Sequence, residues 1–161
     1  VYGEVEIGGT KKNFGRVEPG FMIQTEAHRN MAFAVYHAGQ MPLVGIDTVW
    51  TKSLGNGLTE VNAIVSNSRL IPTHTQQDLE NRISPPNMVR LTGGNVVAGF
   101  TVTNALQNQA TEQRRDPANI RVNNIPGNSS VQVRWIVSSG SSFTVSVESQ
   151  KGGSATKVVG R

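Results

Sequence analysis

The pattern of hydrophobic positions changes its period once along this chain, near residue 40. Between Pro19 and Ala38 apolar residues recur every three to four positions, which predicts an α-helix. Proline is tolerated in the first turn of a helix, and Gly39 followed by Pro42 ends it. One side of this helix carries Ile23, Ala27, Met31, Ala34, Val35 and Ala38. A helix this apolar has to lie against something, either one face of a following sheet domain or an α/β domain of a larger parent protein.

After residue 42 the hydrophobic period becomes two, which is typical of β-strands. One such run places Val44, Ile46, Thr48 and Trp50 on one face, and a second places Val61, Ala63 and Val65 on one face. The dipeptide Asn56-Gly57 lies between these two runs and is a strong hairpin signal. The pattern therefore predicts a hairpin of about Val44–Lys52 with Leu58–Asn67.

The rest of the chain repeats short alternating runs separated by turn residues. The predicted strands are Met88–Leu91, Val96–Val102 (with Val96, Ala98, Phe100 and Val102 on one face), Ile120–Val122, Val131–Val137, Phe143–Val147 and an edge strand over Thr156–Val159. Thr75 to Ile83 predicts one or two helical turns capped by Thr75. Ala105–Pro117 is polar and irregular, and we expect an exposed, mobile loop there. This spacing predicts a mainly β protein, an immunoglobulin-like Greek-key β-sandwich preceded by one N-terminal α-helix.

Composition supports this class and excludes others. Of the 161 residues 37% are hydrophobic, and only 16% are charged where about 25% is usual, a polar and uncharged mix that suits a secreted or periplasmic β module. The net charge is +4 and the pI about 9.9, but no run of basic residues exceeds two, so we expect no nucleic-acid partner. There is no cysteine, hence no disulfide and no thiol nucleophile. No apolar run approaches the roughly 18 residues of a membrane span.

The residues that could carry chemistry do not form a recognisable catalytic pattern. His28 and His37 are nine positions apart on the predicted helix and point to opposite sides, and neither they nor His74 has the spacing of a zinc site. Glu4 and Glu6 share one face of a predicted strand over Tyr2–Ile7, as exposed carboxylates commonly do. We therefore assign surface or packing roles to all five and expect no metal site.

Serine, glycine and tryptophan motifs also favour structural roles. Ser139-Gly140-Ser141-Ser142 lies between two strands and predicts a hairpin loop rather than a nucleophile elbow. The run Gly93–Gly99 lacks the phosphate-binding spacing, and Gly99 is interpreted as a bulge or a close-contact site. Trp50 and Trp135 could stack on sugar rings if exposed, but both lie on alternating apolar faces, so we expect core packing. Asn128-Ser129-Ser130 is a glycosylation acceptor pattern, relevant in a eukaryotic source.

Three segments, Tyr2–Gly9, Glu26–Phe33 and Leu70–Thr73, resemble the C-terminal portion of large bacterial zinc carboxypeptidases of the carboxypeptidase A-like family. The resemblance covers about residues 2–75. It implies that residues 1–41 are a strand and the closing helix from the end of an upstream peptidase domain, and that residues 42–161 are a β-sandwich extension. In that family a His-x-x-Glu pair, a later His and a Glu base form the zinc site. None of them has a counterpart here, so no catalytic, cofactor-binding or metal-ligating residue is assigned.

The resemblance implies a non-catalytic accessory domain, without a cofactor of its own, that stabilises the peptidase or positions a substrate or partner. Its partners would be its own upstream peptidase domain, which would hold the zinc, and a peptide or glycan. The chain opens at Val1 without a methionine or a signal peptide, and we interpret it as a piece of a longer protein. The alternative is a glycan- or cell-wall-binding module, with Ala105–Pro117 and an exposed aromatic residue forming the surface. A weaker alternative is an enzyme with an unrecognised site.

Overall fold

The computed structural model describes residues 3–4, 8–9, 15–16 and 19–160, and the chain divides into two compact units, Val1–Gly39 and Gln40–Arg161. In the first unit, α1 spans Gly20–Gly39 and confirms the predicted helix. The backbone N–H of Met22 donates to Pro19 O (2.8 Å), so proline precedes the first turn as expected. No residue of α1 is buried. The strand predicted at Tyr2–Ile7 falls largely outside the described residues.

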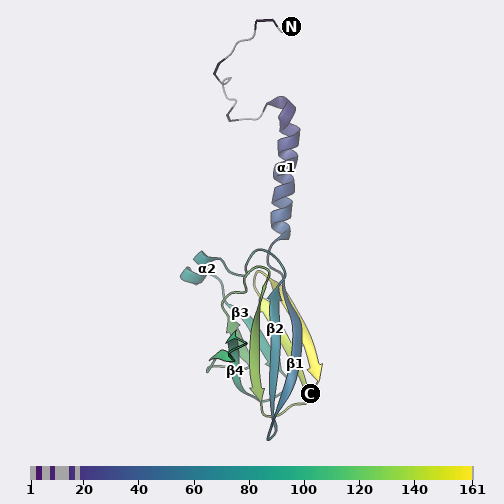
Figure 1. The fold of residues 1–161 in the computed structure, drawn as a ribbon, viewed down its shortest axis with the longest axis vertical. Helices are drawn as coiled ribbons and strands as arrows, with labels where there is room; N and C mark the ends of the chain where they lie inside the picture. The colour runs from purple at the N-terminus through teal and green to yellow at the C-terminus, as the bar shows by residue number, and fades with distance from the viewer. Residues whose placement is uncertain (1–2, 5–7, 10–14, 17–18, 161) are drawn as a thin grey trace. The chain divides into compact units, whose positions relative to one another are not determined.

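The second unit is a sandwich of two antiparallel sheets (Figure 1). Among the described residues, sheet A has the order β1 (Val44–Gly55), β2 (Leu58–Asn67), β7 (Ser129–Val137), β4 (Val96–Asn104) and β5 (Gln109–Glu112). Sheet B has the order β6 (Asn119–Val122), β3 (Asn87–Thr92), β8 (Ser142–Ser149) and β9 (Gly153–Gly160). Strands β2 and β7 are neighbours in sheet A, and β3 and β8 are neighbours in sheet B. The chain crosses from sheet A to sheet B between β2 and β3 and again between β7 and β8, an arrangement that forms the Greek-key core of an immunoglobulin-like sandwich. The predicted fold class is confirmed.

The hairpin of β1 and β2 follows its turn chemistry. Asn56 and Gly57 have φ values of 51° and 79°, and Gly55 pairs with Leu58. Positive φ at both central residues is the signature of a type I′ turn, whose twist matches that of the flanking strands. This turn sets the register in which the first two strands begin to pair.

The core lies between the sheets and contains the inward-facing residues of both. Its buried hydrophobic members include Val61, Ala63, Val65, Val89, Leu91, Ile120, Val133, Trp135, Val137, Phe143, Val145 and Val147. Strands β2, β3, β7 and β8 contribute alternate positions, as the period of two requires. The prediction for β2 is confirmed in face as well as in extent, and β3, β7 and β8 are confirmed as strands, each somewhat longer than predicted.

Two β-bulges overturn the predicted faces of β1 and β4. In β1, Ile46 pairs with Val65 but Thr48 pairs with Ile64, so that Asp47 is an extra residue. In β4, an equivalent shift falls between Val96 and Ala98. Because one extra residue exchanges the two faces of a strand, the residues that follow, up to the next shift in register, point to the opposite side from the one their alternation predicts. Trp50 and Phe100, predicted to share the face of Val44 and of Val96, both face outward instead.

The prediction of an exposed, mobile loop over Ala105–Pro117 is partly wrong, because this segment contains the strand β5. Gln109–Glu112 pairs antiparallel with β4, Thr101 lying opposite Thr111. All four residues of β5 are exposed, so the strand has no buried face and its sequence carries no hydrophobic alternation. Its position at the edge of sheet A is decided by the backbone ladder with β4, which sequence periodicity does not record.

The short helix α2 spans Gln76–Asn81 and lies beside one end of the sandwich (Figure 1). Thr75 caps it as predicted, its hydroxyl accepting from Asp78 N (3.3 Å). Arg82 has left-handed backbone (φ 51°) and ends the helix before Pro85-Pro86. This places α2 over the start of β3, where it borders a surface depression.

Candidate functional site

The histidines do not come together. His28 and His37 are exposed on α1, whereas His74 is buried in the sandwich unit. The Nε2 atom of His74 lies 3.0 Å from Pro85 O, to which it donates, and Nδ1 lies 3.2 Å from the hydroxyl of Thr73. Both ring nitrogens of His74 are thus used by the protein. No group of three or more His, Asp, Glu or Cys residues with the geometry of a metal site occurs in the part of the chain that the structure describes.

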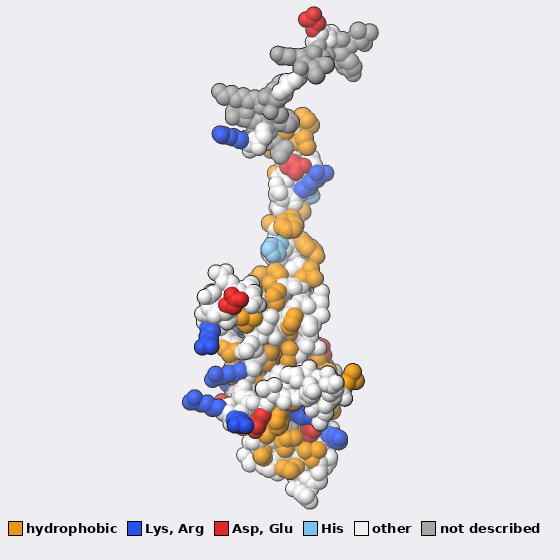
Figure 2. Space-filling view, turned by 60° about the vertical axis from the view of Figure 1, so that its left-hand side comes forward, with side chains coloured by type: hydrophobic (Ala, Val, Ile, Leu, Met, Phe, Trp, Pro, Cys, Tyr) orange, Lys and Arg blue, Asp and Glu red, His pale blue; other side chains and the backbone are white. Residues whose placement is uncertain are grey.

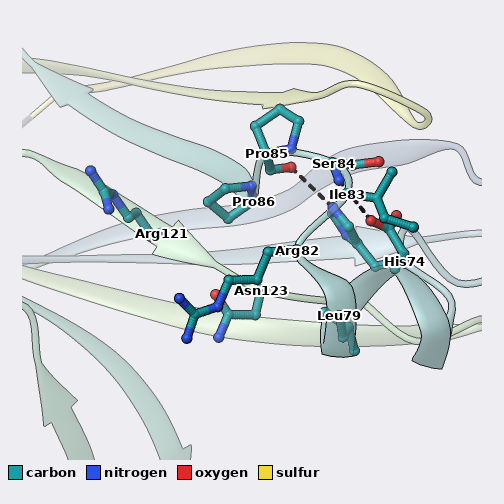
Figure 3. Close-up of a pocket in the computed structure, with 10 residues that line it drawn as sticks. His74, Leu79, Arg82, Ile83, Ser84, Pro85, Pro86, Arg121 and Asn123 are labelled. Carbon is teal, nitrogen blue, oxygen red and sulfur yellow. Dashed lines mark hydrogen bonds between the residues drawn. The ribbon is translucent and has the colours of Figure 1, made fainter.

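A depression of about 580 Å³ lies between α2 and the start of β3 (Figure 3). His74, Asp78, Arg82, Ile83, Pro86, Arg121 and Asn123 are among its lining residues. The side chains of Arg82 and Arg121 point away from His74, and the backbone N–H of Ser84 donates to Asp78 Oδ1 (2.7 Å) (Figure 3). His74 and Asp78, which line this depression, are both held by hydrogen bonds within the protein.

Asp78 is a structural carboxylate that ties α2 to the turn between β8 and β9. Its Oδ2 atom accepts from Lys151 Nζ at 2.5 Å. The hydrogen bond from Lys151, opposed by burial and aided by the N–H of Ser84, lowers the pKa of Asp78 from 3.8 to about 2. The folded state therefore prefers the ionised carboxylate more than the unfolded chain does.

We expect the pair to make stability depend on pH in acid. Because the folded pKa of Asp78 lies below the unfolded value, its contribution is complete above pH 3.8 and is lost as the pH falls towards 2. Asp78→Asn should be less stable than the wild type at neutral pH, and the difference should shrink as the pH falls through this window. Urea unfolding at several pH values measures it, with Lys151→Met as the matched control from the other side of the pair. A difference that stays constant from neutral pH to pH 2 would contradict the assignment.

The other candidate motifs occupy structural or surface positions. Glu4 is exposed, and Glu6 lies outside the described residues. A Cβ on Gly93 would lie 2.1 Å from Ser142 O and one on Gly94 2.3 Å from Ser139 O, so the start of the glycine run packs against the connection between β7 and β8. Gly99 is a close-contact site as predicted, since a Cβ there would lie 2.2 Å from Pro117 O. Asn128 is exposed just before β7, where its acceptor pattern is accessible.

The two tryptophans have opposite environments. Trp135 is completely buried in the core, as predicted, whereas 36% of Trp50 is exposed, and the expectation of core packing for Trp50 is wrong. The physical reason is the bulge at Asp47, after which Val49 takes the inward position and packs against the core. Outward exposure of an aromatic side chain in the middle of a strand is the main functional signal of this structure.

The outer face of sheet A carries a continuous row of side chains across all five strands. Strand register places Trp50 opposite Asn62, Asn62 opposite Arg134, Arg134 opposite Phe100, and Phe100 opposite Glu112. We call these five residues the sheet A row. The row begins and ends at edge strands and has an aromatic residue towards each end. Sequence analysis missed it because the members come from five separate strands and two of them are shifted by bulges.

Polar side chains hold the centre of the sheet A row in place. Asn62 Oδ1 accepts from Arg134 Nε and from Gln132 Nε2, both at 3.1 Å, and Asn62 Nδ2 donates to Glu60 Oε1 (2.7 Å). Arg134 Nη1 donates to Asn108 Oδ1 (2.7 Å) in the turn before β5. Only 1% of Asn62 is exposed although it faces outward, so its neighbours cover it. The network makes this a rigid surface rather than a set of independent side chains.

Glu60, Phe100, Asn108, Ala110, Arg134 and Ile136 line an open depression of about 310 Å³ on this face. It contains an aromatic ring, an amide group and a guanidinium beside one another. Surfaces of this composition bind through ring stacking and directed hydrogen bonds rather than through a nucleophile or a metal. The geometry therefore defines a β-sandwich with a candidate binding surface on one sheet.

Comparisons with known proteins assign the sandwich unit to a family. Residues 43–160 match the family described as a domain of unknown function (DUF8731), and the chain belongs to that family. A search of curated protein sequences finds no match. Among solved structures, the chain is similar to the crystal structure of a conjugative transposon lipoprotein from Bacteroides eggerthii, with 12% identity and a TM-score of 0.33. That similarity covers 73% of this chain and 93% of the other.

Proposed function

We propose that this chain is a non-catalytic accessory domain of a zinc metallocarboxypeptidase that removes C-terminal residues from peptides. In this proposal α1 closes the peptidase domain, and the sandwich stabilises that domain or positions a substrate or partner beside it. The resemblance of residues 2–75 motivates the proposal. Zinc would belong to the upstream domain and not to this chain.

The observation that supports it best is the exposure of α1. Large hydrophobic side chains are exposed along the helix, namely Phe21, Met22, Ile23, Met31, Phe33, Val35 and Tyr36 (Figure 2). Phe21 is 85% exposed and Phe33 68%. A helix that is apolar on more than one side is normally buried in a larger core, since exposed apolar patches of this size are rare in soluble monomers. A peptidase domain that packs around α1 would supply that cover.

We propose a secreted or periplasmic location for the protein. Its composition is poor in charge and rich in Gly, Ser, Asn and Thr. We also propose that the protein has no nucleic-acid partner, since basic side chains are interspersed with acidic and uncharged ones on the face shown in Figure 2. None of the described helices has the length and hydropathy to cross a membrane.

A second candidate function is a glycan- or cell-wall-binding module. A specific observation favours it: Trp50 is exposed on the same outer face to which the turn before β5 contributes Asn108. The glycan-binding hypothesis requires a surface formed by an exposed aromatic residue and by Ala105–Pro117. Trp50 is an exposed aromatic residue, and Asn108 belongs to that segment. The two roles are compatible, because an accessory domain can hold a wall component near its enzyme.

The accessory role predicts that the 161-residue chain neither binds zinc stoichiometrically nor hydrolyses peptides. Zinc content after dialysis and release of C-terminal residues from a peptide with a free carboxyl terminus measure these two properties. The positive control is the longer polypeptide encoded together with this stretch, whose upstream sequence should contain a His-x-x-Glu pair. Tight one-to-one zinc together with hydrolysis by this chain alone would overturn the proposal.

A further inference from the structure

The sheet A row combines groups that together match one class of ligand. Trp50 and Phe100 offer aromatic surfaces three strand positions apart, which is roughly 14 Å at the usual spacing between strands. Between them lies the guanidinium of Arg134, which is held by the covered amide of Asn62. A flat, extended molecule with apolar faces and many hydroxyl groups can contact all of these at once.

The polar groups between the rings are already fixed before any ligand binds. Only 18% of the Arg134 side chain is exposed, and its Nε and Nη1 atoms donate to Asn62 and Asn108. The described residues offer no hydrogen-bond partner to Nη2 of Arg134, which leaves donor capacity for a ligand. A preorganised donor binds with a smaller loss of conformational entropy than a free arginine would.

The charges of the sheet A row select against an ionic partner. The row contains one cation, Arg134, and one anion, Glu112, and each has an opposite charge beside it: Glu60 at 3.7 Å from Arg134, and Arg114 at 3.6 Å from Glu112. A strongly acidic or basic peptide, or a nucleic acid, would meet no net complementary charge here. The complementary ligand is uncharged.

We infer that the outer face of sheet A binds an uncharged β-linked glycan chain, laid across the strands from Trp50 to Phe100. The sugar rings stack their C–H faces on the two aromatic residues, and their hydroxyls exchange hydrogen bonds with Arg134, Gln132 and Glu112. Equatorial substituents keep the faces of such rings flat, which favours β-linked sugars over globular ligands. This inference rests on the second candidate function, the glycan-binding module, and does not depend on which catalytic domain accompanies the chain.

Calorimetric titration of the 161-residue chain with cellohexaose, xylohexaose and chitohexaose tests the inference. We expect at least one of these to bind, with an affinity that changes little when salt is added. Trp50→Ala should weaken binding about tenfold or more, and Phe100→Ala several-fold. Phe33→Ala, which removes an exposed aromatic ring from α1, should leave the affinity unchanged. Thermal unfolding of each variant checks that the sandwich is intact.

Tryptophan fluorescence gives a second readout that uses the wild-type chain. The chain has two tryptophans, and only Trp50 is accessible to a quencher such as acrylamide. The bound hexaose should protect this emission from quenching, and in Trp50→Phe the remaining emission of Trp135 should not respond.

The inference is overturned if none of the three hexaoses binds, or if Trp50→Ala binds as the wild type does. Unchanged quenching in the presence of a bound hexaose would likewise exclude this face. If the glycan-binding tests fail, the zinc-binding and hydrolysis tests of the accessory role keep their meaning. Conversely, zinc-dependent hydrolysis by this chain would overturn the accessory role without affecting glycan binding, so the two failures are distinguishable.

Discussion

Replacing Trp135 with alanine should lower the free energy of unfolding by about 3–5 kcal/mol, the usual cost of truncating a buried tryptophan. Trp135 is completely buried, and its strand neighbours are Val61 on β2 and Gly99 on β4. Gly99 has no side chain that could move into the space. Because the cost of a cavity depends on how far its surroundings can collapse, this site should lie at the upper end of the range.

Trp135→Phe separates packing from hydrogen bonding at the same position. The Nε1 atom of Trp135 is buried and has no hydrogen-bond partner among the described residues. Replacing the indole with a phenyl ring removes some packing but also removes an unsatisfied donor, whose burial costs about 1–3 kcal/mol. We therefore expect Trp135→Phe to lose less than half as much stability as Trp135→Ala in urea unfolding. Equal losses would indicate that the indole N–H has a partner, such as a buried water molecule.

The second large effect is expected at Gly127, in the loop that leads into β7. A Cβ at this position would lie 1.8 Å from Leu70 O and 2.5 Å from Leu70 C, which are backbone atoms and cannot rotate away. The neighbouring N–H of Asn128 donates to Arg69 O (2.8 Å), so the two loops are also joined by a hydrogen bond. Gly127→Ala must push the loops apart and should cost about 1–3 kcal/mol, the usual range for overpacking.

Gly45→Ala is the matched control for this experiment. Gly45 also lies in the sandwich and lacks a positive φ, but the atom nearest to a Cβ added there would be Ser66 Oγ at 3.9 Å, an ordinary contact. We expect a change within about 0.5 kcal/mol, as for most surface substitutions. If thermal and urea unfolding show the same loss for both variants, the close approach of Gly127 to Leu70 does not exist in solution.

Several elements of this protein follow from local physical chemistry, which is why sequence alone predicts them. Asn56-Gly57 adopts positive φ at both positions and so fixes the β1–β2 hairpin. Thr75 caps α2 because its hydroxyl reaches Asp78 N within one turn. Strict alternation around Trp135 and Phe143 places them in the core, where both are completely buried. In each case the determining residues are neighbours along the chain.

The faces of β1 and β4, and with them the candidate binding surface, were decided only by the tertiary structure. A bulge at Asp47 is set by how β1 pairs with β2, and pairing between strands is not recorded in the period of either one. Trp50 therefore moves from a predicted core position to the surface. In β4 the half-buried Phe100 likewise faces outward, away from the face that it was predicted to share with Val96. β5 has no buried face and exists because β4 offers it backbone hydrogen bonds. The sheet A row brings together residues 50, 62, 100, 112 and 134, whose adjacency arises from strand order and register rather than from any motif.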